Sequence, residues 1–346
     1  MILKYFGPLG AASMLLFAIG CGGGNTSLSS SNHAVGVYVV QNGTGSGNSV
    51  LELPAGAQGS VAPSNSVTVP SQTTYDAVAI DTSGNLYVSA SVVTAPPFLN
   101  EILVYAPAAT GGATPIRTLT GLPGLATSIA VDATGAVYAL SGSSTQAGTT
   151  LSVFAPGATG NAAPIRQISG PLTQLDSASA IAVDAAQNIY VANTAGNDVL
   201  VFSSTANGNA APTGILAGAT TLIGVPTGVA VDSAGDIYVS SFNQPSNSSL
   251  LLEFAPAATG NVAPTRTLTS LATDTLYGLA VDSADYLFVY TVVPTSSTVI
   301  PTSSQLQVSV FSPGATSGSA PSQTITSSTW TAPTAPSSIN GQIAVQ

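Results

Sequence analysis

Residues 228–239 read Gly-Val-Ala-Val-Asp-Ser-Ala-Gly-Asp-Ile-Tyr-Val, and this stretch is one copy of a pattern that repeats along most of the chain. Its centre, an alanine followed by a branched aliphatic residue and an aspartate, occurs at Ala79-Ile80-Asp81, Ala130-Val131-Asp132, Ala182-Val183-Asp184, Ala230-Val231-Asp232 and Ala280-Val281-Asp282. Successive aspartates lie 51, 52, 48 and 50 residues apart. A fixed period of this length is typical of repeat architectures in which each unit packs on the next.

A second marker indicates six units rather than five. It is a proline that ends an alanine-rich turn, found at Pro63, Pro115, Pro164, Pro212, Pro264 and Pro321. In the unit that begins near Ala178, short apolar runs lie at 180–183, 189–191, 199–202 and around 215–216. Turn residues separate the runs, a pattern that predicts consecutive antiparallel strands. Four strands per unit predict one blade of a β-propeller.

The four strands of a unit differ in character. The first contains the repeated alanine and is expected to line a central channel, where small side chains let six strands converge. The fourth follows the proline and contains Arg117, Arg166 or Arg266, which predicts an outer edge blocked by proline and charge. Glutamates in or beside third strands are expected to face solvent. These are Glu52, Glu101 and Glu253.

The two ends of the chain predict how the ring closes. The first unit has counterparts of strands two, three and four, beginning with Val37-Tyr38-Val39, but no Ala-Val-Asp strand precedes them. The final residues 341–346, Gly-Gln-Ile-Ala-Val-Gln, supply that missing strand. We therefore predict an all-β fold over 35–346, a six-bladed propeller closed by a C-terminal strand that joins the N-terminal blade. Five or seven blades, a β-helix and a sandwich are the alternatives.

The repeat resembles the NHL-type propeller unit, in which Gly-Val-Ala-Val-Asp is followed by Gly-Asn-Ile-Tyr-Val-Ala-Asp and a run ending in Val-Phe. Its nearest copies here are 228–239 and the stretch from Asn188 to Phe202. Asn193 stands where the family often has aspartate, and Ser89, Leu140, Ser240 and Tyr290 depart further. The resemblance implies the fold. It does not imply one activity, because such propellers include both binding modules and enzymes.

The N-terminus has the features of an export signal. Lys4 precedes an apolar stretch from Leu9 to Ile19, which is too short for a permanent membrane span of about 20 residues. Ala18-Ile19-Gly20-Cys21 resembles the lipobox of bacterial lipoproteins, which implies lipidation of Cys21. We expect a signal peptide at 1–20, a flexible tether at 21–34 and an outer-membrane location in a Gram-negative cell. An ordinary secretory signal is the alternative.

Composition limits the classes of partner and of chemistry. The formal net charge is -10 and only four residues are basic, so nucleic acid is an unfavourable partner. The single histidine, His33, falls in the tether and cannot supply a multi-histidine zinc site or a Ser-His-Asp triad. The repeated aspartates are expected to cap their own hairpin turns rather than bind calcium. No cofactor is predicted, and we expect a monomer.

Aromatic residues in the predicted loops of one face suggest a binding surface. The turns between strands two and three share this face with the connections between blades, and three of those turns, 89–100, 240–249 and 290–305, are long. The candidate binding residues are Tyr75, Phe98, Phe242, Tyr277, Tyr290 and Trp330. Packing of these rings beneath their own loops is the alternative.

Three functions are compatible with this pattern. The favoured one is a lipid-anchored, non-enzymatic envelope scaffold that binds a protein or polysaccharide. The second is a metal-assisted hydrolase or lactonase at the channel mouth, which would use Asp76, Asp176 and Asp274 from the loops that lead into first strands. The third is a purely structural spacer.

Overall fold

The structure is a computed structural model, and it describes residues 36–41, 49–68, 73–92, 99–142, 148–243, 248–271, 275–294, 304–326 and 343–346. The chain divides into two units, 1–31 and 32–346, and all described residues belong to the second. The predicted signal peptide and tether, with Cys21 and His33, lie outside the described residues. In the described part, no helix has the length and apolar character needed to span a membrane.

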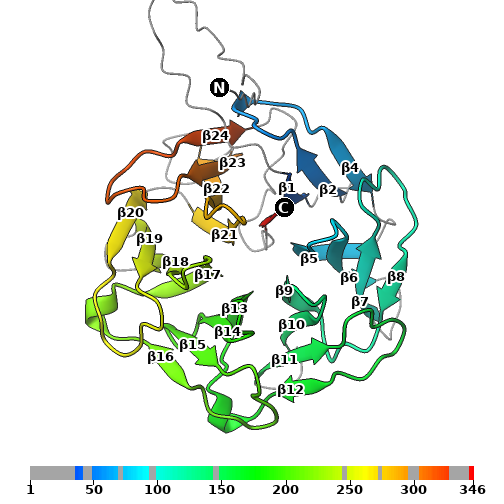
Figure 1. The fold of residues 1–346 in the computed structure, drawn as a ribbon, viewed down its shortest axis with the longest axis horizontal. Coiled ribbons are helices and arrows are strands. Elements are labelled where there is room, and N and C mark those ends of the chain that lie inside the picture. Colours follow the sequence, from blue (N-terminus) through cyan, green and yellow to red (C-terminus); the bar gives the residue numbers. More distant parts are fainter. Residues whose placement is uncertain are drawn as a thin grey trace, which may run out of the picture. The chain divides into compact units, whose positions relative to one another are not determined.

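Four antiparallel sheets are formed by strands that follow one another in sequence, and each begins at the central axis and ends at the rim (Figure 1). Blade 2 contains β5 (Thr73–Ile80), β6 (Leu86–Val92), β7 (Leu99–Tyr105) and β8 (Arg117–Leu119). Blade 3 contains β9 (Ala126–Val131), β10 (Val137–Gly142), β11 (Thr149–Phe154) and β12 (Arg166–Ile168). Blade 4 contains β13 (Ala178–Val183), β14 (Ile189–Asn193), β15 (Asp198–Phe202) and β16 (Gly214–Leu216). Blade 5 contains β17 (Val225–Val231), β18 (Ile237–Asn243), β19 (Ser248–Phe254) and β20 (Arg266–Leu271).

The two remaining sheets close the ring. Blade 6 contains β21 (Thr275–Val281), β22 (Leu287–Pro294), β23 (Ser304–Phe311) and β24 (Gln323–Thr326). Blade 1 contains β1 (Val37–Gln41), β2 (Ser49–Leu53) and β4 (Asn65–Thr68), with β25 (Ile343–Val345) as its inner strand. β25 pairs antiparallel with β1, so that Val37 is opposite Val345 and Val39 is opposite Ile343. The fold is a six-bladed β-propeller. Closure by the C-terminal strand is as predicted.

The core lies between neighbouring blades. The second strands contribute one large ring per blade from blade 2 onward, and each of these rings is at most 6 % exposed. They are Tyr87, Tyr138, Tyr190, Tyr238 and Phe288. One buried cluster joins Tyr138 and Leu151 of blade 3 to Ile181 and Phe202 of blade 4. Second and third strands are therefore apolar on both faces because each sheet is covered on two sides.

The outer edge is protected differently from our prediction. The edge of each fourth strand makes backbone bonds to a glycine in the next blade, through parallel bridges such as Leu119 to Gly160 and Ile168 to Gly208. Two further bridges of this kind join Val67 to Gly111 and Leu216 to Gly260. Between blades 5 and 6 the contact is a hydrogen bond from the N–H of Gly318 to the carbonyl of Thr267. Between blades 6 and 1 it is the parallel pairing of β24 with the short strand β3 (Gly59–Ser60). This belt of contacts surrounds the propeller, so proline and arginine do not block the edge by themselves.

The belt glycines have backbone angles that a side chain disfavours. Gly111 has a φ of 55°, and its N–H and C=O bond Ser66 O and Thr68 N, both at 2.7 Å. A Cβ there would meet no atom within 4 Å, so Gly111→Ala changes only the backbone energy. We expect a loss of about 1–2 kcal/mol of unfolding free energy, measured by urea denaturation. Gly112→Ala, which also meets open space but has no positive φ, should be neutral or slightly stabilising; equal losses from both would contradict the prediction.

Candidate functional site

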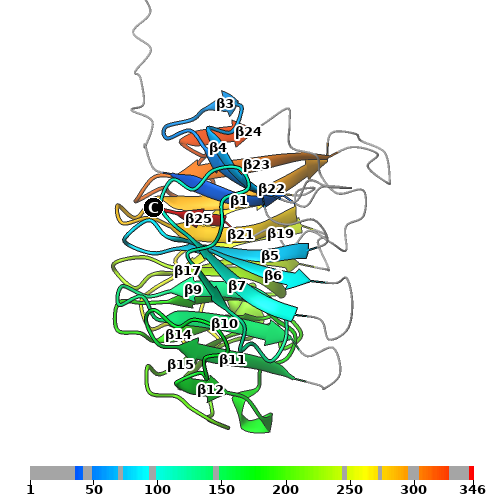
Figure 2. The same cartoon turned by 90° about the vertical axis from the view of Figure 1, so that its right-hand side faces the viewer.

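The propeller has two faces that differ in their connections (Figure 2). We call the turn face the one with the hairpin turns between first and second strands, 81–85, 132–136, 184–188, 232–236 and 282–286, and the links from third to fourth strands. We call the connection face the opposite one. It contains the turns between second and third strands and the links between blades, which include the short 3-10 helices η1 (Pro171–Thr173) and η2 (Ala219–Thr221). The predicted binding surface belongs to the connection face.

The repeated aspartates cap their own turns, as predicted. Asp132 Oδ1 accepts hydrogen bonds from the N–H of Thr134 at 2.9 Å and of Ala136 at 3.0 Å, while Oδ2 accepts from the Tyr138 hydroxyl at 3.1 Å. Burial acts to raise the pKa of Asp132, but hydrogen bonds led by those from Thr134 and Ala136 hold it below its ordinary value. Burial, followed by the charge of Asp132, raises the pKa of Tyr138 to about 12. This pair is therefore ionised aspartate and neutral tyrosine near pH 7, a stable cap rather than an acid-base pair.

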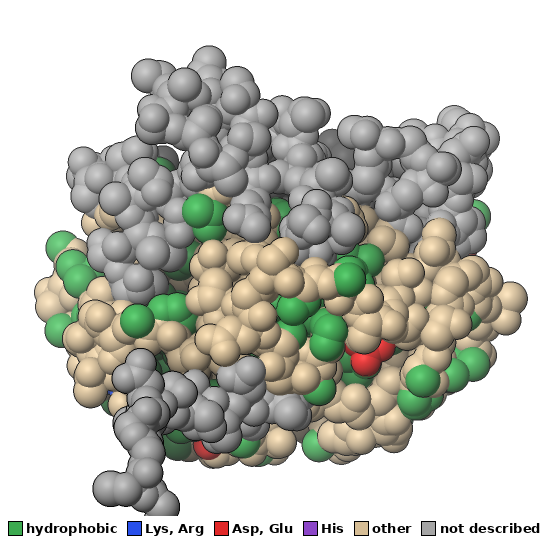
Figure 3. Space-filling view, turned by 90° about the horizontal axis from the view of Figure 1, so that it is seen from above, with side chains coloured by type: hydrophobic (Ala, Val, Ile, Leu, Met, Phe, Trp, Pro, Cys, Tyr) green, Lys and Arg blue, Asp and Glu red, His purple; other side chains and the backbone are tan. Residues whose placement is uncertain are grey.

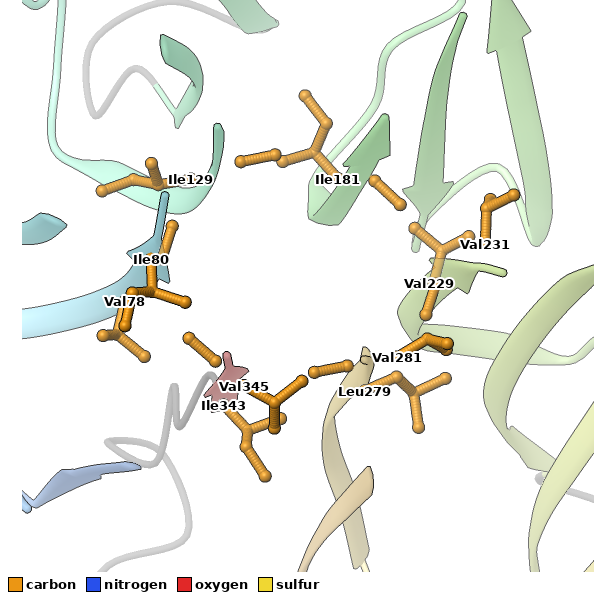
Figure 4. A pocket seen from close by; sticks show the side chains of 16 residues that line it. Val78, Ile80, Ile129, Ile181, Val229, Val231, Leu279, Val281, Ile343 and Val345 are labelled. Atoms are coloured by element: carbon orange, nitrogen blue, oxygen red, sulfur yellow. The ribbon is translucent and has the colours of Figure 1, made fainter. Parts of the chain in front are cut away.

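The axis of the propeller is a bore that is lined by aliphatic side chains and by the backbone of the first strands. Its hollow has a volume of about 190 Å³ and is lined by 16 residues from all six first strands (Figure 4). Figure 4 shows branched side chains around the hollow, among them Ile129, Ile181, Val229 and Ile343. Every lining residue is alanine, valine, isoleucine or leucine, and the repeated alanines are among them, as predicted. These side chains contain no group that could ligate a metal or transfer a proton.

The three carboxylates proposed for a channel-mouth enzyme are not brought together in what the structure describes. Asp176 is exposed, and its backbone is fixed by Asn193, whose Oδ1 accepts the Asp176 N–H at 2.6 Å. Asp274 and the side chain of Asp76 lie outside the described residues. Among residues that are described, no three His, Cys, Asp or Glu side chains are close enough to hold a metal ion.

Asn193 organises the connection face of blade 4. It is 1 % exposed, and its Nδ2 donates to Gln174 O at 3.0 Å and to Asp198 Oδ1 at 2.8 Å. Burial raises the pKa of Asp198, and the bond from Asn193 partly offsets this. The asparagine thus ties a turn between two strands to the preceding inter-blade link. The sequence signal for this link was Asn193 itself, which stands where the NHL-type unit often has aspartate.

The predicted aromatic residues have different outcomes. Phe242 lies in β18 near its connection-face end and is half-buried. Tyr290 was predicted to be in a loop, but β22 continues to Pro294, so Tyr290 is inside a strand and only 1 % exposed. It is not an exposed binding residue. Tyr75 and Tyr277 lie in β5 and β21, with side chains outside the described part, and Phe98 and Trp330 also lie outside it.

A buried ion pair in blade 5 was missed from the sequence. Glu253 was expected to face solvent, but it is 4 % exposed. Arg266 donates to its Oε1 from Nε at 2.9 Å, and Nη2 lies 2.5 Å from Oε2. Burial raises the pKa of Glu253, although Arg266 opposes the shift. In blades 2 and 3 the arginine instead lies over a tyrosine ring, with Arg117 Cζ 5.7 Å from the centre of Tyr87.

On the side seen in Figure 3, the described residues show few charged side chains and scattered apolar ones. The large exposed hydrophobic residues are Leu99, Ile116, Ile165, Leu172, Leu222 and Val262. They are distributed over blades 2 to 5 and the links that join them. Single exposed hydrophobic residues are normal on soluble proteins and do not by themselves define a partner.

Comparison with known proteins supports the fold alone. No family model matches the chain. No curated protein matches it either. Among solved structures, a Bacteroides caccae protein of unknown function has 9 % identity and a TM-score of 0.56 over 90 % of this chain and 98 % of its own. The WD40 β-propeller domain of Doa1 has 14 % identity and a TM-score of 0.53 over 86 % of this chain and 80 % of its own.

Proposed function

We propose that this chain is a lipid-anchored propeller of the NHL-repeat type in the cell envelope, and that it binds a protein or polysaccharide without catalysing a reaction. Cys21 would hold the anchor, and the connection face would hold the binding surface. The observation that supports this best is that the polar side chains examined as candidate site residues have structural roles in the described part. The hairpin aspartates cap turns, Asn193 fixes a link, Glu253 pairs with Arg266, and the side chains that line the bore are aliphatic.

The connection face is favoured over the turn face for a structural reason. On the turn face, the hairpins and the links from third to fourth strands repeat with nearly the same turn chemistry, as at 81–85 and 132–136. On the connection face, the links differ from blade to blade, and specific recognition usually depends on such variable loops on a rigid scaffold. Phe242 is the predicted binding residue whose side chain is described there and is partly accessible.

The test is a binding screen with the full chain in mild detergent against arrays of envelope polysaccharides and envelope proteins. We expect a partner whose affinity falls about tenfold or more in Phe242→Ala, because aromatic anchors dominate binding energy. The matched control is Ile165→Ala, since Ile165 is 57 % exposed but lies on the turn face, and its affinity should be unchanged. A partner that loses affinity only with Ile165→Ala would place binding on the turn face and contradict the proposed surface. The absence of any partner would count against a binding scaffold.

A further inference from the structure

In blades 2 and 4, the last residue of the hairpin turn donates a side-chain hydrogen bond to the repeated aspartate. Asn85 donates from Nδ2 to Asp81 Oδ2 at 2.8 Å, and Asn188 donates from Nδ2 to Asp184 Oδ2 at 2.9 Å. Each asparagine is the fifth residue of its turn, counted from the aspartate. The fifth turn position is therefore one place from which an amide can reach the Oδ2 atom.

Blade 3 shows a second such place, on the following blade. Its fifth turn residue is Ala136, which has no donor in its side chain. The Oδ2 atom of Asp132 instead accepts from Nε2 of Gln187 at 3.0 Å. Gln187 is the fourth turn residue of blade 4 and has a φ of 63°. An amide on either the fifth position or the next blade's fourth position can thus complete the bonding of the repeated aspartate.

Blade 5 has a carboxyl group at both of these positions. Asp236 is its fifth turn residue, and Asp285 is the fourth turn residue of blade 6, with a φ of 61°. The turn itself has the usual geometry, because the Asp236 N–H donates to Asp232 Oδ1 at 2.8 Å. Within the described part, Asp232 Oδ2 accepts from the Tyr238 hydroxyl at 3.0 Å and from no amide. A carboxyl group can supply the second bond only when it is protonated.

Asp285 is held against the blade 5 turn as an acceptor. Its Oδ1 accepts the backbone N–H of Ser233 at 2.9 Å, and its Oδ2 accepts the Ser233 hydroxyl at 2.8 Å. These bonds join blade 6 to blade 5 and favour the ionised form of Asp285. The side chain that takes the proton is therefore Asp236, for which the described part shows no side-chain hydrogen bond.

The charges around Asp236 are mainly negative. They come from its own turn, from β19, from β20 and from blade 6, and they are Asp232, Glu253, Arg266 and Asp285. Burial, followed by the charge of Asp232, raises the pKa of Asp236; Asp285 acts in the same direction and Arg266 opposes both. The one cation in this group is already paired with Glu253.

We propose that Asp236 is a proton-operated switch in the turn face. When it takes a proton from solvent, its carboxyl O–H donates to Asp232 Oδ2 and supplies the bond that blades 2 to 4 take from an amide. Protonation also removes a negative charge beside Asp285, so the contact between blades 5 and 6 becomes stronger in acid. At neutral pH, two adjacent carboxylates leave this turn weaker than its counterparts. The inference does not depend on a partner at the connection face.

The first test is Asp236→Asn in the full chain in mild detergent, melted between pH 4 and pH 7 and followed by circular dichroism. Folding raises the pKa of Asp236, so the proton stabilises the folded chain, and this contribution is lost as pH rises through the folded pKa. Asparagine donates at every pH. The variant should melt about 2 °C above wild type at pH 7 and at the same temperature as wild type at pH 4.

The matched control is Asn188→Asp, which installs the second carboxyl group in blade 4. It removes the 2.9 Å bond to Asp184 and should have the opposite sign, with melting about 2 °C below wild type at pH 7. This deficit should shrink toward pH 4, where the new carboxyl group can donate. A deficit that is equal at both pH values would contradict a proton-dependent bond at this turn position.

Infrared titration of the carboxyl band observes the proton directly. Wild type should contain a protonated carboxyl group that persists to higher pH than an ordinary aspartate, and Asp236→Asn should lack it. Asp285→Asn, which removes a neighbouring negative charge, should move this titration to lower pH. The proposal is overturned if the titration is unchanged in Asp236→Asn, or if that variant differs from wild type by the same amount at pH 4 and pH 7.

Discussion

Arg266→Leu is expected to lower the free energy of unfolding by about 3–5 kcal/mol, because it leaves the carboxylate of Glu253 buried without its partner. Glu253 is 4 % exposed, and Arg266 supplies the short contacts to both of its oxygens. The substitution also removes the bond from Arg266 Nη1 to Ala315 O, which links blade 5 to blade 6. Guanidinium chloride denaturation at pH 7 measures the loss.

The pH dependence of this loss has a defined sign. Burial already raises the pKa of Glu253 in the folded chain, and removal of Arg266 raises it further. An acid whose pKa is raised by folding binds its proton more tightly in the folded state, so its ionisation destabilises the fold as pH rises through the folded pKa. The difference in stability between wild type and Arg266→Leu should therefore shrink between pH 7 and pH 5. A difference that stays constant would mean that Glu253 is not the cause.

The control for Arg266→Leu is Glu253→Val, which copies blades 2 and 3. Val104 and Val153 occupy the equivalent position, opposite Tyr87 and Tyr138. There the arginine contacts the tyrosine instead, as in the 2.9 Å bond from Arg117 Nη2 to the Tyr87 hydroxyl. Arg266 can adopt the same arrangement with Tyr238, so Glu253→Val should change stability by less than about 1.5 kcal/mol. The double variant Arg266→Leu, Glu253→Val should recover most of the loss.

The fold could be predicted because local pattern and global topology agree at every level. The regular spacing of the repeated aspartates predicted the division into blades, and the turn residues between apolar runs predicted where one strand ends and the next begins. The belt glycines were missed for a physical reason. Gly111 and Gly160 looked like ordinary turn residues within one unit, whereas their backbone groups bond to the preceding blade. Contacts between units are not visible in the pattern of a single unit.

The site was less predictable because side-chain burial depends on the exact length of strands. Tyr290 was assigned to the long loop 290–305, but β22 continues four residues beyond it, to Pro294, and the ring is buried. Glu253 was assigned to solvent because carboxylates are seldom buried. Its partner, Arg266, lies 13 residues later on the adjacent strand, and the pair could have been found from the register of strands three and four.

Removal of residues 343–346 is expected to cause the largest loss of stability, on the order of 5 kcal/mol. β25 provides the inner strand of blade 1 and pairs with β1 at Val37, Tyr38 and Val39. Its Ile343 is 5 % exposed and packs in the cluster that contains Val39 and Leu51. Without it, the inner edge of β1 and the adjoining bore would be open to water. The unfolding midpoint in guanidinium chloride measures the loss.

The control separates ring closure from simple loss of apolar contact. Ile343→Val keeps the strand and removes one methylene, so it should cost only about 0.5–1.5 kcal/mol. A peptide with the sequence of 341–346, added to the truncated chain, should raise its unfolding midpoint in proportion to peptide concentration, because ligands that bind only the folded state stabilise it by mass action. A truncated chain that unfolds at the wild-type midpoint would show that three blade-1 strands hold the ring without β25. Such a ring would leave the inner-edge backbone groups of β1 without the strand partner that β25 supplies at Val37, Tyr38 and Val39.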